Sequence, residues 1–201
     1  MDEKLERLLA YRTTNYVMFL PSQYQECSFQ NFDWTDQKPG IWGTILNFIE
    51  DKLLDKKQRP FKGLFLFGSF GVGKSHLLAG IYRVIAAKLE DVSELQFIEF
   101  AELIDGIKHR FGETGASASF EQIFKSCDYL FLDDITSTRM TEFSIDILEK
   151  FIQYRYSNGL RTCITSQFGI EKLDFLSFHA RSRLFEMCVP LEIKGRDRRL
   201  E

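Results

Sequence analysis

Apolar residues recur along the chain in two patterns, short continuous runs and longer segments with helical spacing. Continuous runs are typical of strands that are covered on both faces, and they lie at 63–67, 95–100, 129–132, 161–165 and 189–193. Apolar residues spaced by three and four positions predict helices at 42–57, 74–89, 101–111, 120–125, 142–156, 170–173 and 178–186. Strands that alternate with helices predict an α/β fold with a mainly parallel, five-stranded sheet covered by helices on both faces.

The first part of the chain departs from this alternation. Leu5, Leu8 and Leu9 share one face of a short amphipathic helix at 2–12, which either docks on its own domain or binds a partner. Residues 17–39 contain mixed aromatic residues without a clear period, and we interpret them as an ordered linker. We expect an N-terminal helix and linker at 1–26 and a single domain at 27–201.

Composition excludes several classes of protein. The 201 residues are 44% hydrophobic and 27% charged, which is typical of a globular domain. A net charge of -3 provides no overall basic field, so nucleic-acid binding would need a local patch or an oligomer. The four cysteines lack metal-ligand spacing, and Cys127 and Cys163 are expected to be buried thiols. The sequence contains no membrane-length apolar run or signal-peptide pattern, so we expect a cytoplasmic protein.

A phosphate-binding pattern follows the first predicted strand. Gly68–Ser75 matches G-x-x-x-x-G-K-[ST] at every fixed position. Glycines let backbone N–H groups converge on a polyphosphate, and the following helix directs its N-terminus at that point. Lys74 adds charge for the β- and γ-phosphates, and the Ser75 hydroxyl is placed to ligate Mg²⁺. The residues expected to bind ATP or ADP are Gly68, Ser69, Phe70, Gly71, Val72, Gly73, Lys74, Ser75 and His76. The alternative is a plain glycine-rich turn before a helix.

Two other strands end in polar residues. Asp133 and Asp134 follow the run at 129–132, at the sheet edge where ligands gather in parallel sheets. Asp133 suits Mg²⁺ through water, and Asp134 suits orientation or deprotonation of an attacking water; a helix cap or turn is the alternative for both. Gln167 follows the strand at 161–165 and either bonds the γ-phosphate or simply begins a loop.

Arginines cluster towards the end of the chain. Arg183 lies in a predicted helix, and Arg196, Arg198 and Arg199 follow the last strand. Arginine stabilises charge that develops during phosphoryl transfer, in cis or from a neighbouring subunit. A solvated basic tail is the other interpretation.

In combination these segments resemble bacterial replicative helicase loaders of the DnaC/DnaI type, AAA+ ATPases related to DnaA and the transposition helper IstB. The resemblance covers about residues 27–200 and rests on five segments beyond the phosphate loop. They are 27–32, similar to the segment beside the adenine; 130–135, the acidic strand; 165–168, the sensor-one tip; 180–186, the arginine-finger helix; and 195–199, the closing segment. The resemblance implies an AAA+ three-layer sandwich. It also implies a set of catalytic residues: Lys74, Asp133, Asp134, Gln167, Arg183 as the arginine finger, and Arg199 as the sensor-two arginine.

The resemblance implies an ATPase that acts in DNA replication as a helicase loader, with ATP controlling self-association and the binding of the replicative helicase and single-stranded DNA. Lys108, Arg110 and Phe111 match the family's DNA-facing region, and a basic pair beside an aromatic suits a single strand; an exposed helix end is the alternative. Two features depart from the family: Gln167 replaces its usual Asn, and the helicase-binding domain that precedes its ATPase core is missing from these residues. The alternatives are an IstB-like transposition helper, a nucleotide-binding regulator that does not hydrolyse ATP, and, more weakly, a small-molecule kinase.

Overall fold

A five-stranded parallel sheet forms the centre of the computed structural model, which describes residues 20–37, 40–49, 62–89, 95–110, 127–136 and 139–198. The strands are β1 (Gly63–Phe67), β2 (Leu95–Glu99), β3 (Tyr129–Asp133), β4 (Arg161–Ser166) and β5 (Cys188–Glu192). Their order across the sheet is β2-β3-β4-β1-β5, and every neighbouring pair is parallel. The predicted α/β fold with a parallel five-stranded sheet is confirmed.

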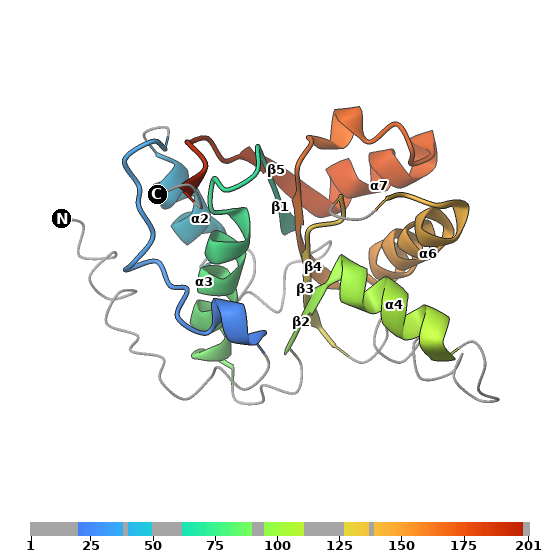
Figure 1. The fold of residues 1–201 in the computed structure, drawn as a ribbon, viewed down its shortest axis with the longest axis horizontal. Helices are drawn as coiled ribbons and strands as arrows, with labels where there is room; N and C mark the ends of the chain where they lie inside the picture. Colours follow the sequence, from blue (N-terminus) through green and yellow to red (C-terminus); the bar gives the residue numbers. More distant parts are fainter. Residues whose placement is uncertain are drawn as a thin grey trace.

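Helices cover both faces of the sheet (Figure 1). One face carries α2 (Ile41–Phe48) and α3 (Lys74–Ala86), and the other carries α4 (Phe100–Arg110), α6 (Glu142–Asn158) and α7 (Phe178–Met187). Short 3-10 turns lie at η1 (Ser22–Tyr24) and η4 (Ile170–Lys172). Each face buries its own apolar cluster, because successive strand residues point to opposite sides.

The strand β3 illustrates why continuous apolar runs identified the sheet. All five of its residues are buried, with Phe131 in the cluster beneath α3 and Leu130 and Leu132 in the cluster beneath α4 and α6. A strand with helices on both sides has no solvent face, so its sequence does not alternate. The expected strand at 63–67 has the bounds of β1, and the other expected boundaries that fall in the described residues differ from those of the structure by at most three residues.

Local signals fix the ends of α6. Thr141 and Ser144 form a reciprocal capping box at its start, and Gly159 ends it at φ 61°. Arg155, in its last turn, is fully buried and donates to the carbonyl oxygens of Cys127, Asp128 and Arg161 and to the Thr162 hydroxyl. This arginine joins α6 to the amino ends of β3 and β4.

The aromatic segment before α2 packs against the domain. Phe29 and Phe32 are buried, and Trp34 contacts the rings of Phe32 and Trp42. These contacts explain an aromatic-rich segment without a period, because the rings pack against one another and against α3 from an irregular backbone. The predicted helices at 2–12 and 120–125 and the last part of the one at 42–57 lie outside the described residues. No helix in the described ranges is long and apolar enough to cross a membrane.

Candidate nucleotide-binding site

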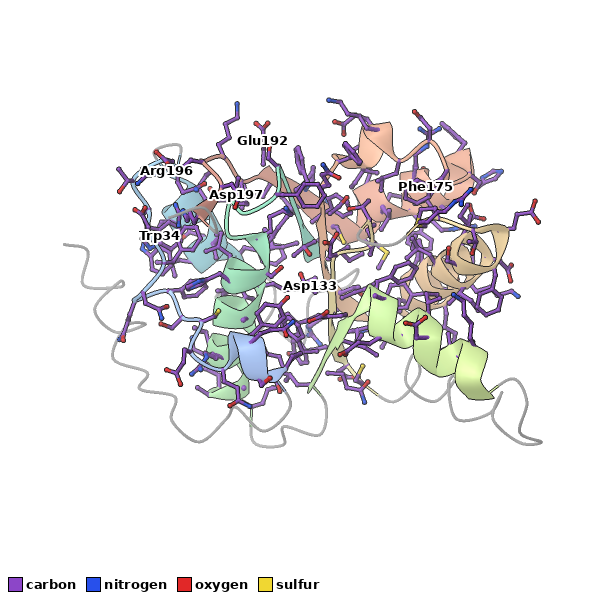
Figure 2. All side chains as sticks on the ribbon, in the orientation of Figure 1. Trp34, Asp133, Phe175, Glu192, Arg196 and Asp197 are labelled. Carbon is purple, nitrogen blue, oxygen red and sulfur yellow. The ribbon has the colours of Figure 1, made fainter. Side chains whose placement is uncertain are left out.

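The carboxyl ends of three adjacent strands bring the predicted site residues to one edge of the sheet. Phe67 at the end of β1 is in register with Ser166 of β4, and Leu132 of β3 is in register with Ile164 of β4. The loop after β1 and Asp133 therefore meet across β4. Asp133 lies near the centre of the molecule, and Trp34, Arg196 and Asp197 gather on the side that carries α2 and α3 (Figure 2).

The loop between β1 and α3 has the backbone that its glycines permit. Gly71 and Gly73 have φ of 71° and 94°, in the left-handed region that other residues rarely adopt. A Cβ on Gly73 would lie 2.5 Å from the Phe32 ring, and one on Gly71 would lie 1.7 Å from Asp197 Oδ1. Gly73 caps α3 without a side-chain bond, so the first N–H groups of that helix face the loop. This is the cradle that the sequence pattern predicted.

Lys74 follows the loop closely. Its Nζ donates to the carbonyl oxygens of Gly68 at 2.9 Å and Ser69 at 2.7 Å, and the residue is 8% exposed. The Lys74 ammonium group therefore lies against the first residues of the glycine loop. His76, two residues further along α3, contacts Ser28 and Asn31 through Nε2, and burial lowers its pKa.

Asp133 is the most buried acid of the site, at 1% exposure. Its Oδ1 accepts from the Thr165 hydroxyl at 2.5 Å, and its Oδ2 accepts from the Tyr24 hydroxyl at 2.9 Å. Burial raises the pKa of Asp133, and the neighbouring hydroxyls of Thr165, Tyr24 and Ser75 oppose that rise. Burial and the Asp133 charge raise the pKa of Tyr24, which stays a phenol and a donor at neutral pH.

A hydroxyl and a carboxylate thus lie side by side at the mouth of the loop. Oxygen atoms are the ligands that Mg²⁺ prefers. The Ser75 hydroxyl lies close enough to Asp133 to lower the pKa of that carboxyl, so two such oxygen ligands adjoin the glycine loop. The residues present fit a magnesium ion bound with nucleotide phosphates.

Asp134 occupies a turn. It has φ 47°, its N–H donates to Thr165 Oγ1 at 2.8 Å, and its Oδ1 accepts from the N–H and hydroxyl of Thr136. The N–H of Gln167 donates to the same Thr136 hydroxyl at 2.8 Å. Of the alternatives open from the sequence, the turn is what the structure contains, and a catalytic role for either side chain remains a prediction.

The other predicted residues lie away from the loop or outside the described ranges. Arg183 is on α7, on the opposite side of the sheet from α3, and its guanidinium lies 5.8 Å from the centroid of the Tyr156 ring. Lys108 is on α4 and pairs with Asp105 at 3.8 Å. Arg110 is the last residue of α4, and Phe111 and Arg199 lie outside the described residues.

Three contacts of the site were missed by sequence reasoning. Tyr24 carried no motif, Thr165 was taken only as part of a polar strand end, and Arg198 and Asp197 reach the phosphate loop through the closing segment. The N–H of Arg198 donates to Gly71 O at 3.2 Å. A hydroxyl residue on the strand beside an acidic strand end was the one available signal, and it pointed to Thr165.

The chain matches the family model described as AFG1-like ATPase over residues 16–173. It is 24% identical over 214 aligned residues to the replicative helicase loader DnaI of Bacillus subtilis (strain 168), covering 99% of this chain and 67% of that protein. A crystal structure of the DnaC helicase loader aligns with a TM-score of 0.66 and 26% identity, over 87% of this chain and 100% of that one. The resemblance to helicase loaders of the DnaC/DnaI type is confirmed, as is the AAA+ fold.

A structure of the replication initiator DnaA bound to AMPPCP and single-stranded DNA has the same fold. Its TM-score is 0.68 at 19% identity, over 89% of this chain and 52% of that one. At that identity the likeness concerns the fold alone.

Proposed function

Because the chain belongs to the AFG1-like ATPase family, we propose that it is an AAA+ ATPase that acts in DNA replication as a helicase loader or helicase-remodelling factor. ATP controls its binding to the replicative helicase and to single-stranded DNA. The observation that carries the nucleotide part is that the glycine loop with Lys74 and Ser75 lies at the same edge of the sheet as Asp133. The loader part is supported by the likeness to the helicase loaders DnaI and DnaC.

In this proposal the loop holds the phosphates through backbone N–H groups and the start of α3. Lys74 exchanges the carbonyls of Gly68 and Ser69 for phosphate oxygens, which are stronger partners for an ammonium group. Ser75 and Asp133 hold Mg²⁺, the carboxylate through water. Bound Mg²⁺ neutralises charge on the β- and γ-phosphates.

Hydrolysis needs groups from two copies of the chain. Asp134 and Gln167 lie at the strand ends beside Asp133 and are the candidates that contact the attacking water. Arg183 lies on the far side of the sheet from α3, so we propose that it serves the site of a neighbouring subunit in an ATP-dependent oligomer. Arg199 is proposed as the sensor-two residue.

The loader proposal is tested by light scattering after size-exclusion chromatography of this protein mixed with the replicative helicase of its own organism. We expect a complex in one nucleotide state, ATP or ADP, and none in the other. Lys74→Ala removes the charge that binds the phosphates and is expected to abolish the difference. Absence of a complex in both states would overturn the loader proposal and leave ATP binding, measured separately with a fluorescent ATP analogue, to stand or fall by itself.

The trans finger is tested by phosphate release from mixed variants. Arg183→Ala and Lys74→Ala are each expected to hydrolyse ATP poorly. A mixture of the two is expected to recover activity, because one interface combines an intact loop with an intact finger. Arg181→Ala is the matched control, since Arg181 is on the same helix but bonds Asp174 of its own subunit at 3.0 Å. No recovery in the mixture, or equal loss in both arginine variants, would contradict the assignment.

Single-stranded DNA binding is tested by fluorescence anisotropy with a labelled oligonucleotide. The proposal expects tighter binding with ATP than without nucleotide, and affinity that falls as salt concentration rises. Lys108→Ala is expected to weaken binding, while Lys150→Ala, an exposed lysine of α6 paired with Asp146, is expected to leave it unchanged. Equal binding by both variants would remove Lys108 from the proposed DNA surface.

A further inference from the structure

Two consecutive side chains of η1 bind the ends of two neighbouring strands. The Tyr24 hydroxyl donates to Asp133 Oδ2 at 2.9 Å, and Gln23 Nε2 donates to Glu99 Oε1. Glu99 and Asp133 are register partners at the ends of β2 and β3. The ring of Tyr24 packs against Phe97 of β2, with centroids 5.4 Å apart. The turn η1 is therefore attached to the sheet beside the carboxylate of the magnesium site.

Backbone hydrogen bonds fix η1 on both sides of Tyr24. The Tyr24 N–H donates to Pro21 O at 2.9 Å, and the Cys27 N–H donates to Tyr24 O at 3.0 Å. Leu20, just before the turn, is 4% exposed within the apolar cluster beneath α3. Both sides of Tyr24 are thus anchored, so its hydroxyl is presented to Asp133 by a fixed backbone and a packed ring.

The acceptor capacity of Asp133 gives this contact a consequence for the metal. A carboxylate accepts about four hydrogen bonds. Thr165 and Tyr24 each donate to one of its oxygens, and the side chain is 1% exposed. These donors determine how the carboxylate is rotated and which direction is left for a water molecule of the metal. Partners of this kind, beyond the metal ligands themselves, orient ligands and tune metal affinity.

We infer that Tyr24 is a positioning residue of the magnesium site. Its hydroxyl, together with that of Thr165, holds the Asp133 carboxylate in the rotation that faces Ser75, and it ties the segment before the ATPase core to the bound nucleotide. This inference rests on the proposed ATP and Mg²⁺ binding and is independent of the helicase partner. Because coupling between two sites is reciprocal, magnesium and nucleotide also strengthen the attachment of η1 to the sheet.

The test compares Tyr24→Phe with wild type in the full chain. Phenylalanine keeps the ring on Phe97 and removes only the hydroxyl. We measure the affinity for a fluorescent ATP analogue in EDTA and in a titration of magnesium chloride. The expected result is an unchanged affinity in EDTA and a magnesium requirement about tenfold higher. A purely structural role for Tyr24 would change both conditions together.

Tyr82→Phe is the matched control. Tyr82 is a buried tyrosine of α3 whose ring also packs against Phe97, with centroids 6.1 Å apart, so the chemical change and the ring cluster are the same. Its variant is expected to keep the wild-type magnesium requirement. A second readout is the rise in Tm that magnesium adds to ATP-bound protein, which is expected to shrink in Tyr24→Phe alone.

Other results would contradict either the positioning role of Tyr24 or the proposed function, and the two cases can be told apart. Equal magnesium requirements in Tyr24→Phe and wild type would overturn the positioning role, and a lower requirement in the variant would make Tyr24 a competitor of the metal instead. Wild-type protein that binds no ATP would overturn both this inference and the nucleotide part of the proposed function. A wild-type protein that binds ATP with magnesium but forms no helicase complex would leave the role of Tyr24 intact.

Discussion

The guanidinium of Arg198 lies 4.7 Å from the centroid of the Phe32 ring, so the closing segment meets the segment before α2. Arg198 also donates to Asp33 O at 2.5 Å, and its backbone N–H donates to Gly71 O. Phe32 in turn lies against Gly73. The segment before α2 and the closing segment therefore both contact the loop at 68–75, and they also contact each other.

Removal of the Arg198 side chain is expected to weaken the contact between these two segments. Arg198 is 19% exposed along its side chain and contacts both the Phe32 ring and Asp33, so Arg198→Ala is expected to lower the free energy of unfolding by about 1 kcal/mol. Arg196→Ala is the control, because Arg196 is 66% exposed and lies 3.9 Å from Asp36. Urea unfolding measures the stability of both variants. Equal losses of stability would contradict a specific role for the contacts of Arg198.

Gly71 is expected to tolerate no side chain. In Gly71→Ala the new methyl would collide with Asp197, and the φ of 71° adds about 1 kcal/mol of backbone strain. We expect lower stability and weaker ATP binding. Gly159→Ala has the same kind of strain, at φ 61°, with nothing within 4 Å, so the difference between the two measures the Asp197 contact. Asp197→Ala in the Gly71→Ala background should restore part of the stability; no restoration would assign the loss elsewhere.

Thr165 is expected to support Asp133 from inside the sheet. Thr165→Val keeps the shape of the side chain but removes the donor to Asp133 Oδ1 and the acceptor of the Asp134 N–H. Leaving these buried groups unpaired costs about 1–3 kcal/mol, and magnesium-dependent ATP binding should weaken. Thr165→Ser keeps the hydroxyl and should behave like wild type in calorimetric binding. Similar affinities for the valine and serine variants would show that the hydroxyl has no role.

Arg155 is expected to be essential for folding. Arg155→Met removes a fully buried guanidinium and leaves the carbonyls of Cys127, Asp128 and Arg161 without that donor. The expected loss is about 3–5 kcal/mol. Lys150→Ala on the outer face of the same helix should change stability by less than about 0.5 kcal/mol. Thermal unfolding compares the two, and a stable Arg155→Met protein would contradict the role of this network.

Thiol reactivity is expected to separate Cys27 from the other three cysteines. Cys27 is partly exposed, whereas Cys127, Cys163 and Cys188 are buried, and burial raises the pKa of Cys163 to about 12. A raised pKa means less thiolate at pH 8 than a free cysteine has, so buried thiols react slowly and Cys27 reacts first. Mass spectrometry after brief alkylation should find one modified thiol in the native protein and four in denaturant. Early modification of Cys163 or Cys188 would contradict the packing of β4 and β5.

The candidate phosphate loop and its place in the fold could be predicted because the signals for them are local. The spacing within Gly68–Ser75 fixes a loop and a helix start, and a parallel sheet brings strand ends such as Asp133 to the same edge. By contrast, the contact of Tyr24 with Asp133 spans 109 residues, and that of Arg198 with Asp33 spans 165. Neither has a sequence period or a motif, because each depends on how irregular segments fill the space over α3.

The local structure at Asp134 also could not be predicted from the sequence. From the sequence it was open whether this acid orients water or stabilises a turn, since both uses suit an aspartate after a buried strand. The backbone at φ 47° and the bonds from Thr136 are properties of the folded strand ends, and they decide for the turn without excluding the other role.

Local patterns were enough to predict the parallel sheet, the order of strands and helices along the chain, and the candidate phosphate loop, because buried strands, helix faces and glycine turns are encoded within a few residues of one another. The contacts of Tyr24 and Thr165 with Asp133, and those of Arg198 and Asp197 with the loop, emerge from the folded chain alone. Those contacts depend on burial and on the register between distant strands, which act between segments that the sequence keeps apart.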